Sequence, residues 1–235
     1  MPSPTIQPRL RKATFSDIPS IARCWYHAFF DDEVIGQLMH PYRKEYPEDI
    51  YWFLLRGIRE RFWDWRHQFI VVTVEEDGKE IISGAADWRR VGDGGKKMEL
   101  IWVDPRNLIA PSISLYHKAS LQVFPNRAAD PARASILNTA VANAASYWTG
   151  EHAECWDLYV CGVHPEFQGK GVGKMLVKWG IDMADEELTS ASVLCGEKNR
   201  GFYNRGGLTE DMGALKGSSG GGGIALFRSP NKASE

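Results

Sequence analysis

The segment from Gln168 to Lys174 has residue types and spacing suited to binding phosphate. It reads Gln-Gly-Lys-Gly-Val-Gly-Lys and follows a continuous apolar run, Trp156 to Val163, that predicts a strand buried on both faces. Apolar residues at helical spacing come directly after it. A strand, a glycine-rich loop and a helix in this order aim backbone N–H groups and the positive end of a helix dipole at an anion. The glycines also permit close approach of the backbone, and the two lysines add positive charge.

Two familiar phosphate-binding motifs do not fit this loop. A Walker loop needs a glycine five positions before Gly-Lys, where this chain has His164 or Gln168, and a serine or threonine where Met175 stands. A dinucleotide fingerprint, Gly-x-Gly-x-x-Gly, needs its last glycine where this chain has Lys174 or Leu176. The phosphate ligand is therefore of another kind.

The pattern that does fit is Gln-x-x-Gly-x-Gly, at Gln168, Gly171 and Gly173, preceded by Val-His-Pro-Glu-Phe. It resembles the acyl-coenzyme A pyrophosphate loop of the GNAT superfamily of N-acetyltransferases. A second motif, Asn199-x-x-Phe-Tyr203-x-x-x-Gly-Leu, resembles the other signature of that family and stands in the right order. The resemblance covers roughly residues 156–208, the expected coenzyme-binding core.

The resemblance implies acetyl-coenzyme A as co-substrate and no metal. It implies an α/β (α+β) fold: a central mixed, mostly antiparallel sheet, splayed at the coenzyme site and flanked by helices. The pantetheine arm is expected to pair with the backbone of the 158–163 strand, and we place a bulge at Gly162 because glycine is a poor strand residue. The expected coenzyme-binding residues are Cys161, Gly162, Val163, Gln168, Gly169, Lys170, Gly171, Val172, Gly173, Lys174, Asn199 and Tyr203.

Direct transfer of an acetyl group to an amine needs a proton acceptor and a proton donor. A primary alkyl amine with a pKa of about 10 is protonated at neutral pH, so a base or a water chain must take its proton. Tyr203 is the expected general acid for the departing thiolate. Asp157 stands where histone-type members of the family carry a glutamate, and because aspartate is shorter we expect a water relay. It shares strand parity with Cys161 and Val163. The alternative bases are His164, Glu99, Asp87 and Glu154.

The remaining elements must position these residues. The pattern predicts a short strand near residues 10–13, a helix to Phe30, a second helix over 47–65, strands over 69–74 and 81–88, and later strands over 191–195 and 224–227. A helix is expected to start at Asp130-Pro131 and to end by Gly150. We expect a single domain, 1–235, in which 92–155 is an elaborated helical insertion.

The acceptor is expected to be a small-molecule primary amine. Helices in the 92–155 insertion could cover the cleft that binds the acceptor. Four tryptophans lie in or near this insertion in the sequence, and they would either form an apolar wall of the cleft or belong to the core: Trp88, Trp102, Trp148 and Trp156. Two alternatives stay open, an amine on a peptide or protein, and a non-catalytic sensor module that binds acyl-coenzyme A.

Composition sets the broad class. The 235 residues carry a formal net charge of only −2, so nothing suggests a nucleic-acid partner. No apolar run approaches the roughly 18 residues that a membrane span needs, and a cytoplasmic monomer or homodimer is expected. Three of the four cysteines lie in apolar runs without metal-ligand spacing, which predicts buried free thiols.

Overall fold

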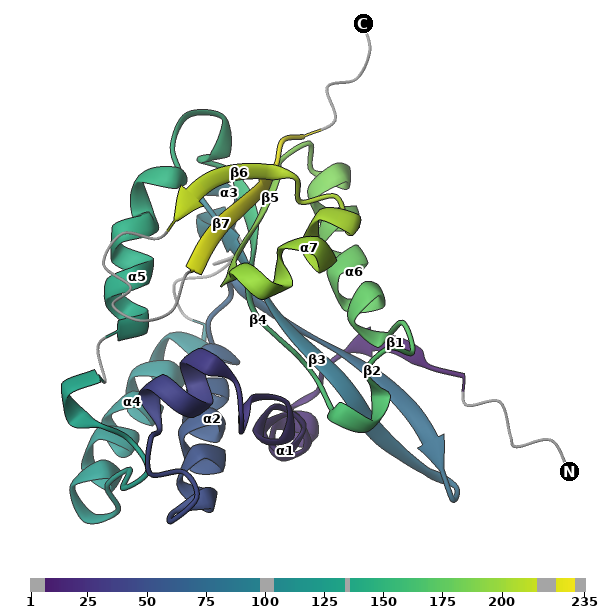
Figure 1. Cartoon of the computed structure of the whole chain (residues 1–235). Coiled ribbons are helices and arrows are strands. Elements are labelled where there is room, and N and C mark those ends of the chain that lie inside the picture. The colour runs from purple at the N-terminus through teal and green to yellow at the C-terminus, as the bar shows by residue number, and fades with distance from the viewer. Residues whose placement is uncertain (1–6, 98–103, 134–135, 215–222, 231–235) are drawn as a thin grey trace, which may run out of the picture.

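The computed structural model describes residues 7–97, 104–133, 136–214 and 223–230. Its centre is one seven-stranded sheet in the order β1-β2-β3-β4-β5-β7-β6 (Figure 1). The strands are β1 Arg9–Lys12, β2 His67–Glu76, β3 Lys79–Val91, β4 Cys155–Val163, β5 Ser190–Gly196, β6 Glu210–Ala214 and β7 Gly223–Arg228.

The sheet is mixed and mostly antiparallel, as expected. Only β4 and β5 run parallel; every other neighbouring pair is antiparallel. The helix between β4 and β5 makes the crossover that a parallel pair requires. β6 is the one strand that the residue pattern did not predict, and its buried and exposed positions do not alternate regularly.

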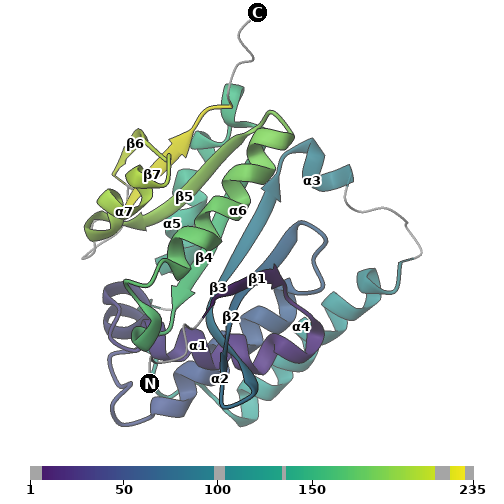
Figure 2. The same ribbon diagram turned by 90° about the vertical axis from the view of Figure 1, so that its right-hand side faces the viewer.

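Helices cover both faces of the sheet (Figures 1 and 2). α6 packs on one face, whereas α1 and α2 pack on the other with α4 lying outside α2. The α-helices are α1 Ile18–Phe29, α2 Pro47–Arg61, α3 Asp93–Lys97, α4 Arg106–Val123, α5 Ile136–Ala144, α6 Val172–Glu186 and α7 Arg200–Arg205.

Two hydrophobic clusters fix these layers. The α6 face of the sheet buries Trp88 and Trp156 against α6, whose expected stripe begins with the buried Val172 and Leu176. The opposite face buries Trp25 of α1 together with the inner side of α2. Burial of three indoles and two rows of aliphatic residues is the main stabilising contribution that holds the sheet between its helices.

The segment 92–155 is largely helical within its described parts, but its details differ from expectation. Residues Pro131–Arg133 form a 3-10 turn and α5 begins at Ile136, not at the Asp130 cap. α4 was not predicted, because Pro111 lies inside it and its apolar side chains are mostly exposed rather than gathered in a buried stripe. α2 also ends at Arg61 instead of Trp65, since the chain turns there to enter β2.

Candidate functional site

The glycine-rich loop enters α6 with its first backbone N–H groups uncapped. Gly169 and Gly171 have φ values of 74° and 85°, in the left-handed region that favours glycine. The first backbone hydrogen bond of α6 runs from the N–H of Met175 to the carbonyl of Gly171 at 3.1 Å. No side chain of the described residues caps the start of this helix. The preceding amides can therefore bind an anion, as the sequence predicts.

The side chains of the loop have different surroundings. Gln168 turns back and donates to the carbonyl of Val163 at 3.1 Å, so it fastens the loop to the end of β4. Val172 is buried, while Lys170 and Lys174 are exposed at the mouth of the loop. A Cβ at Gly173 would lie 3.1 Å from the ring of Phe202, so glycine lets α7 pack close to α6.

β4 and β5 separate about halfway along their length. They pair only from Cys155 with Ser190 to Leu158 with Val193, whereas β4 pairs with β3 as far as Val163. Residues 159–163 therefore have no strand partner, among the described residues, on the side away from β3. This is the expected splay, and it leaves backbone groups that an extended ligand arm can pair with.

The bulge in β4 lies at Tyr159, so the expectation that Gly162 forms it was wrong. The β3–β4 register passes from Trp88 opposite Leu158 to Asp87 opposite Val160, and Tyr159 has no partner residue. Gly162 pairs regularly with β3. Its lack of a side chain serves packing instead: a Cβ there would lie 2.6 Å from the indole Cδ1 of Trp25.

The position of the bulge changes which side chains share a face. Cys161 and Val163 pack in the cluster on the α6 face, together with Leu158. Asp157 lies on the opposite face, because the extra residue at 159 breaks the alternation of the strand. The expected shared parity of Asp157 with Cys161 and Val163 is therefore wrong.

Tyr203 stands between the two separating strands. It lies on α7, is 8% exposed, and packs in the same cluster as Cys161 of β4 and Cys195 of β5. Burial raises the pKa of its hydroxyl well above 10, so the proton is retained at neutral pH. Asn199, at the start of α7, is exposed and its side chain does not cap the helix.

The point after Leu158 and Val193 at which β4 and β5 separate is called the fork here. Asp157 lies directly before it, in the last paired stretch of the two strands. Its carboxylate accepts hydrogen bonds from the hydroxyl of Ser192 at 2.8 Å and from the guanidinium of Arg89 at 2.9 Å. It is 3% exposed, and burial raises its pKa although Arg89 and Ser192 oppose the rise. A buried carboxyl with a raised pKa is a plausible proton acceptor.

A second polar group, made of Asp87, Arg61 and His67, lies next to Tyr159. The sequence did not predict that these residues lie together. Asp87 is fully buried and accepts from Arg61 Nε at 2.6 Å and from His67 Nδ1 at 2.7 Å. The ring of Tyr159 has the guanidinium carbons of Arg61 and Arg89 at 5.0 and 5.3 Å from its centroid. The sequence feature that could have indicated this group is Asp87 itself, because an aspartate within the apolar 81–88 run is expected to be buried and a buried charge needs partners.

These contacts weaken Asp87 as an alternative base. Burial opposes its charge, but His67 and Arg61 hold the pKa of this carboxyl below its usual value. Glu154 accepts from the N–H groups of Asp93 and Gly94, and it also pairs with Arg90 at 2.7 Å. The carboxylates of Asp87 and Glu154 are therefore both held in structural hydrogen bonds and ion pairs.

Two further residues, His164 and Glu99, were expected as alternative bases. His164 is at the loop end of β4, where its ring packs 4.7 Å from that of His27 of α1, centroid to centroid. Glu99 lies outside the described residues. His164 therefore adds no base at the fork.

Of the four tryptophans expected to form an apolar wall or to belong to the core, three lie in the described residues. Trp88 and Trp156 are buried core residues on the α6 face, and Trp102 lies outside the described residues. Among the three described tryptophans of this set, Trp148 lies beside Asp157 and its partners: its indole N–H donates to the Ser192 hydroxyl at 3.1 Å, and Arg89 lies over its ring.

All four cysteines are free thiols, and two are buried. Burial raises the pKa of Cys24, Cys161 and Cys195 to about 12, and that of Cys155 also rises. These thiols stay protonated near neutral pH and are poor nucleophiles there.

Two further searches cover the described ranges only. In those parts of the chain, no group of three or more His, Cys, Asp or Glu side chains is arranged to hold a metal ion. Across the same residues, none of the helices is both long and apolar enough to cross a membrane.

Comparison with known proteins agrees with this geometry. Residues 114–207 match the model of the acetyltransferase (GNAT) family, and no curated protein matches the chain. A structure of histone acetyltransferase HPA2 and related acetyltransferase from Corynebacterium glutamicum has a TM-score of 0.61 at 19% identity, over 97% of this chain and 99% of that one. PaiA N-acetyltransferase from Thermoplasma acidophilum, in complex with coenzyme A, gives 0.50 at 13% identity, over 95% and 99%.

At these sequence identities the solved structures support the fold alone. The residues that match the family model include the splayed strand β4, the glycine-rich loop and Tyr203. The uncapped helix start and the free edge of β4 fit the diphosphate and the extended arm of coenzyme A. Residues 114–207 therefore match the acetyltransferase (GNAT) family, and this match supports an acyltransferase that uses a coenzyme A thioester as acyl donor.

Proposed function

We propose that this enzyme transfers an acetyl group from acetyl-coenzyme A directly to a primary amine of a small molecule. The observation that carries the proposal is the position of Tyr203, a buried and firmly protonated phenol between the separating arms of β4 and β5. A module that only bound the coenzyme would have no need of a proton donor there.

In this proposal the main chain holds the donor. The uncapped N–H groups that open α6 bind the diphosphate, and Lys170 and Lys174 add positive charge at the mouth of the loop. Backbone groups of Cys161 and Val163, along the free edge of β4, pair with the pantetheine arm, and one N–H there stabilises the oxyanion. Asn199 orients the arm or a water molecule.

The acid and the base are then on opposite faces of the sheet. Tyr203, on the α6 face, donates its proton to the departing thiolate. Asp157, on the other face, receives the proton of the amine through water, because both of its oxygens already accept hydrogen bonds. Arg89, which donates to the Asp157 carboxylate and is itself 23% exposed, links this buried group to the surface.

Direct attack is favoured over an acyl-cysteine intermediate. Cys161, like Cys195, packs beside Tyr203, and burial raises the pKa of the Cys161 thiol to about 12. Its thiol is therefore protonated at neutral pH, while the attacking amine needs only to lose one proton.

A small acceptor fits the surroundings of the fork. Arg61 from α2 and Trp148 from the segment after α5 flank Tyr159 and Arg89, and this narrows the approach to the fork on the side of Asp157. Each arginine of this group pairs with a buried aspartate, Arg61 with Asp87 and Arg89 with Asp157, so these two pairs carry no net charge.

The test is a thermal-shift measurement with acetyl-coenzyme A, followed by thiol release across a panel of alkyl amines, aryl amines, amino acids and short peptides. We expect stabilisation by the coenzyme and thiol release with at least one small amine. Stabilisation without thiol release from any amine would support a binding module instead. Release with peptides alone would move the acceptor to a peptide or protein amine.

A further inference from the structure

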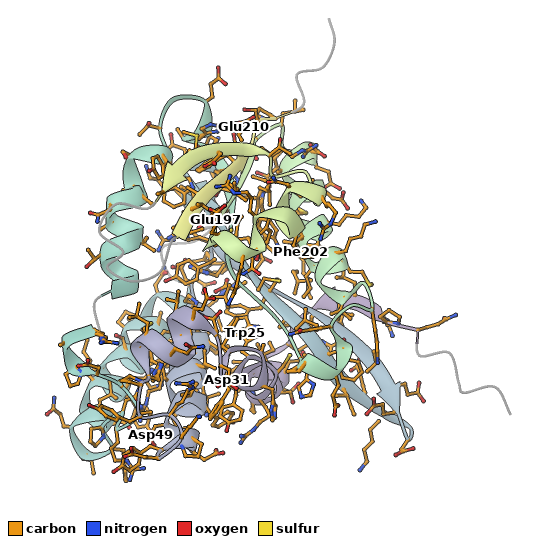
Figure 3. All side chains as sticks on the ribbon, viewed as in Figure 1. Trp25, Asp31, Asp49, Glu197, Phe202 and Glu210 are labelled. Carbon is orange, nitrogen blue, oxygen red and sulfur yellow. The ribbon has the colours of Figure 1, made fainter. Side chains whose placement is uncertain are left out.

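A cavity of about 530 Å³ lies between α2 and α4, on the side of α2 that faces away from the sheet. The inner side of α2 is buried against the sheet through Ile50, Leu54 and Ile58. α2 itself therefore separates this cavity from the fork of β4 and β5. In Figure 3, Asp49 at the cavity lies on the other side of Trp25 from Phe202, which marks the coenzyme side.

The cavity has a surplus of positive charge. Arg127 is neutralised by Asp49, which accepts from its Nε and Nη2 at 3.1 Å. Arg56 and Arg59, three positions apart on α2, also line the cavity, and within the described residues neither has a carboxylate at ion-pair distance. Arg56 makes only a 3.4 Å contact with the carbonyl of Phe124. Asp49 is close enough to Arg56 for that arginine to help lower its pKa, so three lining arginines share one lining carboxylate. The remaining positive charge suits an oxyanion.

The cavity also contains buried polar atoms without a partner. His117 is 3% exposed and its Nδ1 lies 3.1 Å from the carboxylate of Glu60, so Nδ1 carries the proton. The other ring nitrogen, Nε2, and the side-chain oxygen of Asn126 are both buried and unpaired. In the neutral imidazole both atoms accept hydrogen bonds, and a buried acceptor without a donor costs free energy of folding. Both atoms are covered by the protein itself, so a ligand hydroxyl would pair with them once the two side chains turn toward the cavity.

The remaining walls are aromatic. Trp52, Tyr116 and Phe124 line the cavity and are 46%, 64% and 68% exposed. A cavity of this volume, with apolar walls and a few polar groups, has the properties of a small-molecule site.

We propose that this cavity is a second ligand site, distinct from the acetyltransfer site, for a small aromatic anion that also carries a hydroxyl group. Arg56 and Arg59 bind its carboxylate or phosphate group. His117 and Asn126 accept from its hydroxyl, and the three aromatic side chains cover its ring.

The test is isothermal titration calorimetry of the full chain with para-hydroxyphenylacetate. Phenyl phosphate tests whether a phosphate group replaces the carboxylate, and para-hydroxyphenylethanol serves as the uncharged control. We expect binding of the anions and at least about tenfold weaker binding of the uncharged analogue, since a charge-assisted hydrogen bond is lost. Arg56→Gln and Arg59→Gln should each weaken para-hydroxyphenylacetate by about tenfold or more.

The matched control is Arg9→Gln, which removes the same charge from an exposed residue of β1; it should leave the affinity unchanged. Coenzyme A should not displace the probe, because α2 separates the two sites. Three results would each overturn the proposal: no binding of either anion, equal affinity of both arginine variants and the wild type, or displacement by coenzyme A. Because the readout is binding of the probe, it stands apart from any failure of acetyl transfer.

Discussion

Replacement of Tyr203 by phenylalanine tests the proposed proton donor with little disturbance of packing. The ring stays within the cluster on the α6 face, so the free energy of unfolding should change by less than about 1.5 kcal/mol. General acid catalysis contributes about 10²–10⁴-fold. Burial lifts the pKa of Tyr203 well above 10, whereas a free thiol has a pKa of about 8.5, so full proton transfer to the thiolate is uphill. We therefore expect a loss at the low end of this range, about 10²-fold in kcat, which corresponds to an increase of about 2.7 kcal/mol in the activation free energy.

The assay is thiol release with the best amine of the panel, with saturating acetyl-coenzyme A. The KM for acetyl-coenzyme A should stay within about twofold, because the hydroxyl acts in the transition state and not in ground-state binding. Tyr42→Phe removes a hydroxyl from an exposed tyrosine and should have no effect. The wild type should show no alkaline decline from Tyr203 below its ordinary pKa of about 10. A Tyr203→Phe variant with unchanged kcat would remove this residue from the mechanism.

Three further changes probe the loop, the strand and the base. Gly171→Val should abolish the thermal shift by acetyl-coenzyme A, because a φ of 85° disfavours a β-branched side chain; a retained shift would show that the diphosphate binds elsewhere. Gly162→Ala should lower stability by about 1–3 kcal/mol in urea unfolding, since its Cβ would lie 2.6 Å from Trp25, and equal stability would contradict this close contact. Asp157→Asn should lower kcat and remove the acidic limb of the pH–rate profile. Burial raises the pKa of Asp157, so activity of the wild type should fall as pH drops through that raised value, and the same limb in the variant would exclude Asp157 as the base.

Local patterns were enough to predict the parts of the site that depend on neighbours in sequence. The loop from Gln168 to Lys174 needs glycines at positive φ and a following amphipathic helix, and both requirements are visible in residue order. Long alternating or apolar runs also predicted six of the seven strands, because burial of one or both faces imposes its period on the sequence. α4 escaped prediction because its apolar residues are largely exposed.

The tertiary structure decided everything that depends on pairing between distant segments. The bulge at Tyr159 follows from the register of β4 against β3, and neither strand records that register by itself. One extra residue then turned Asp157 to the face opposite Cys161. In the same way, Gly162 carries no sign in sequence that it faces Trp25. The sequence by itself determined where uncapped backbone N–H groups open a helix, since that property is local. Which side chains stand at the fork, and on which face of the sheet each lies, is a property of packing between residues far apart in the chain.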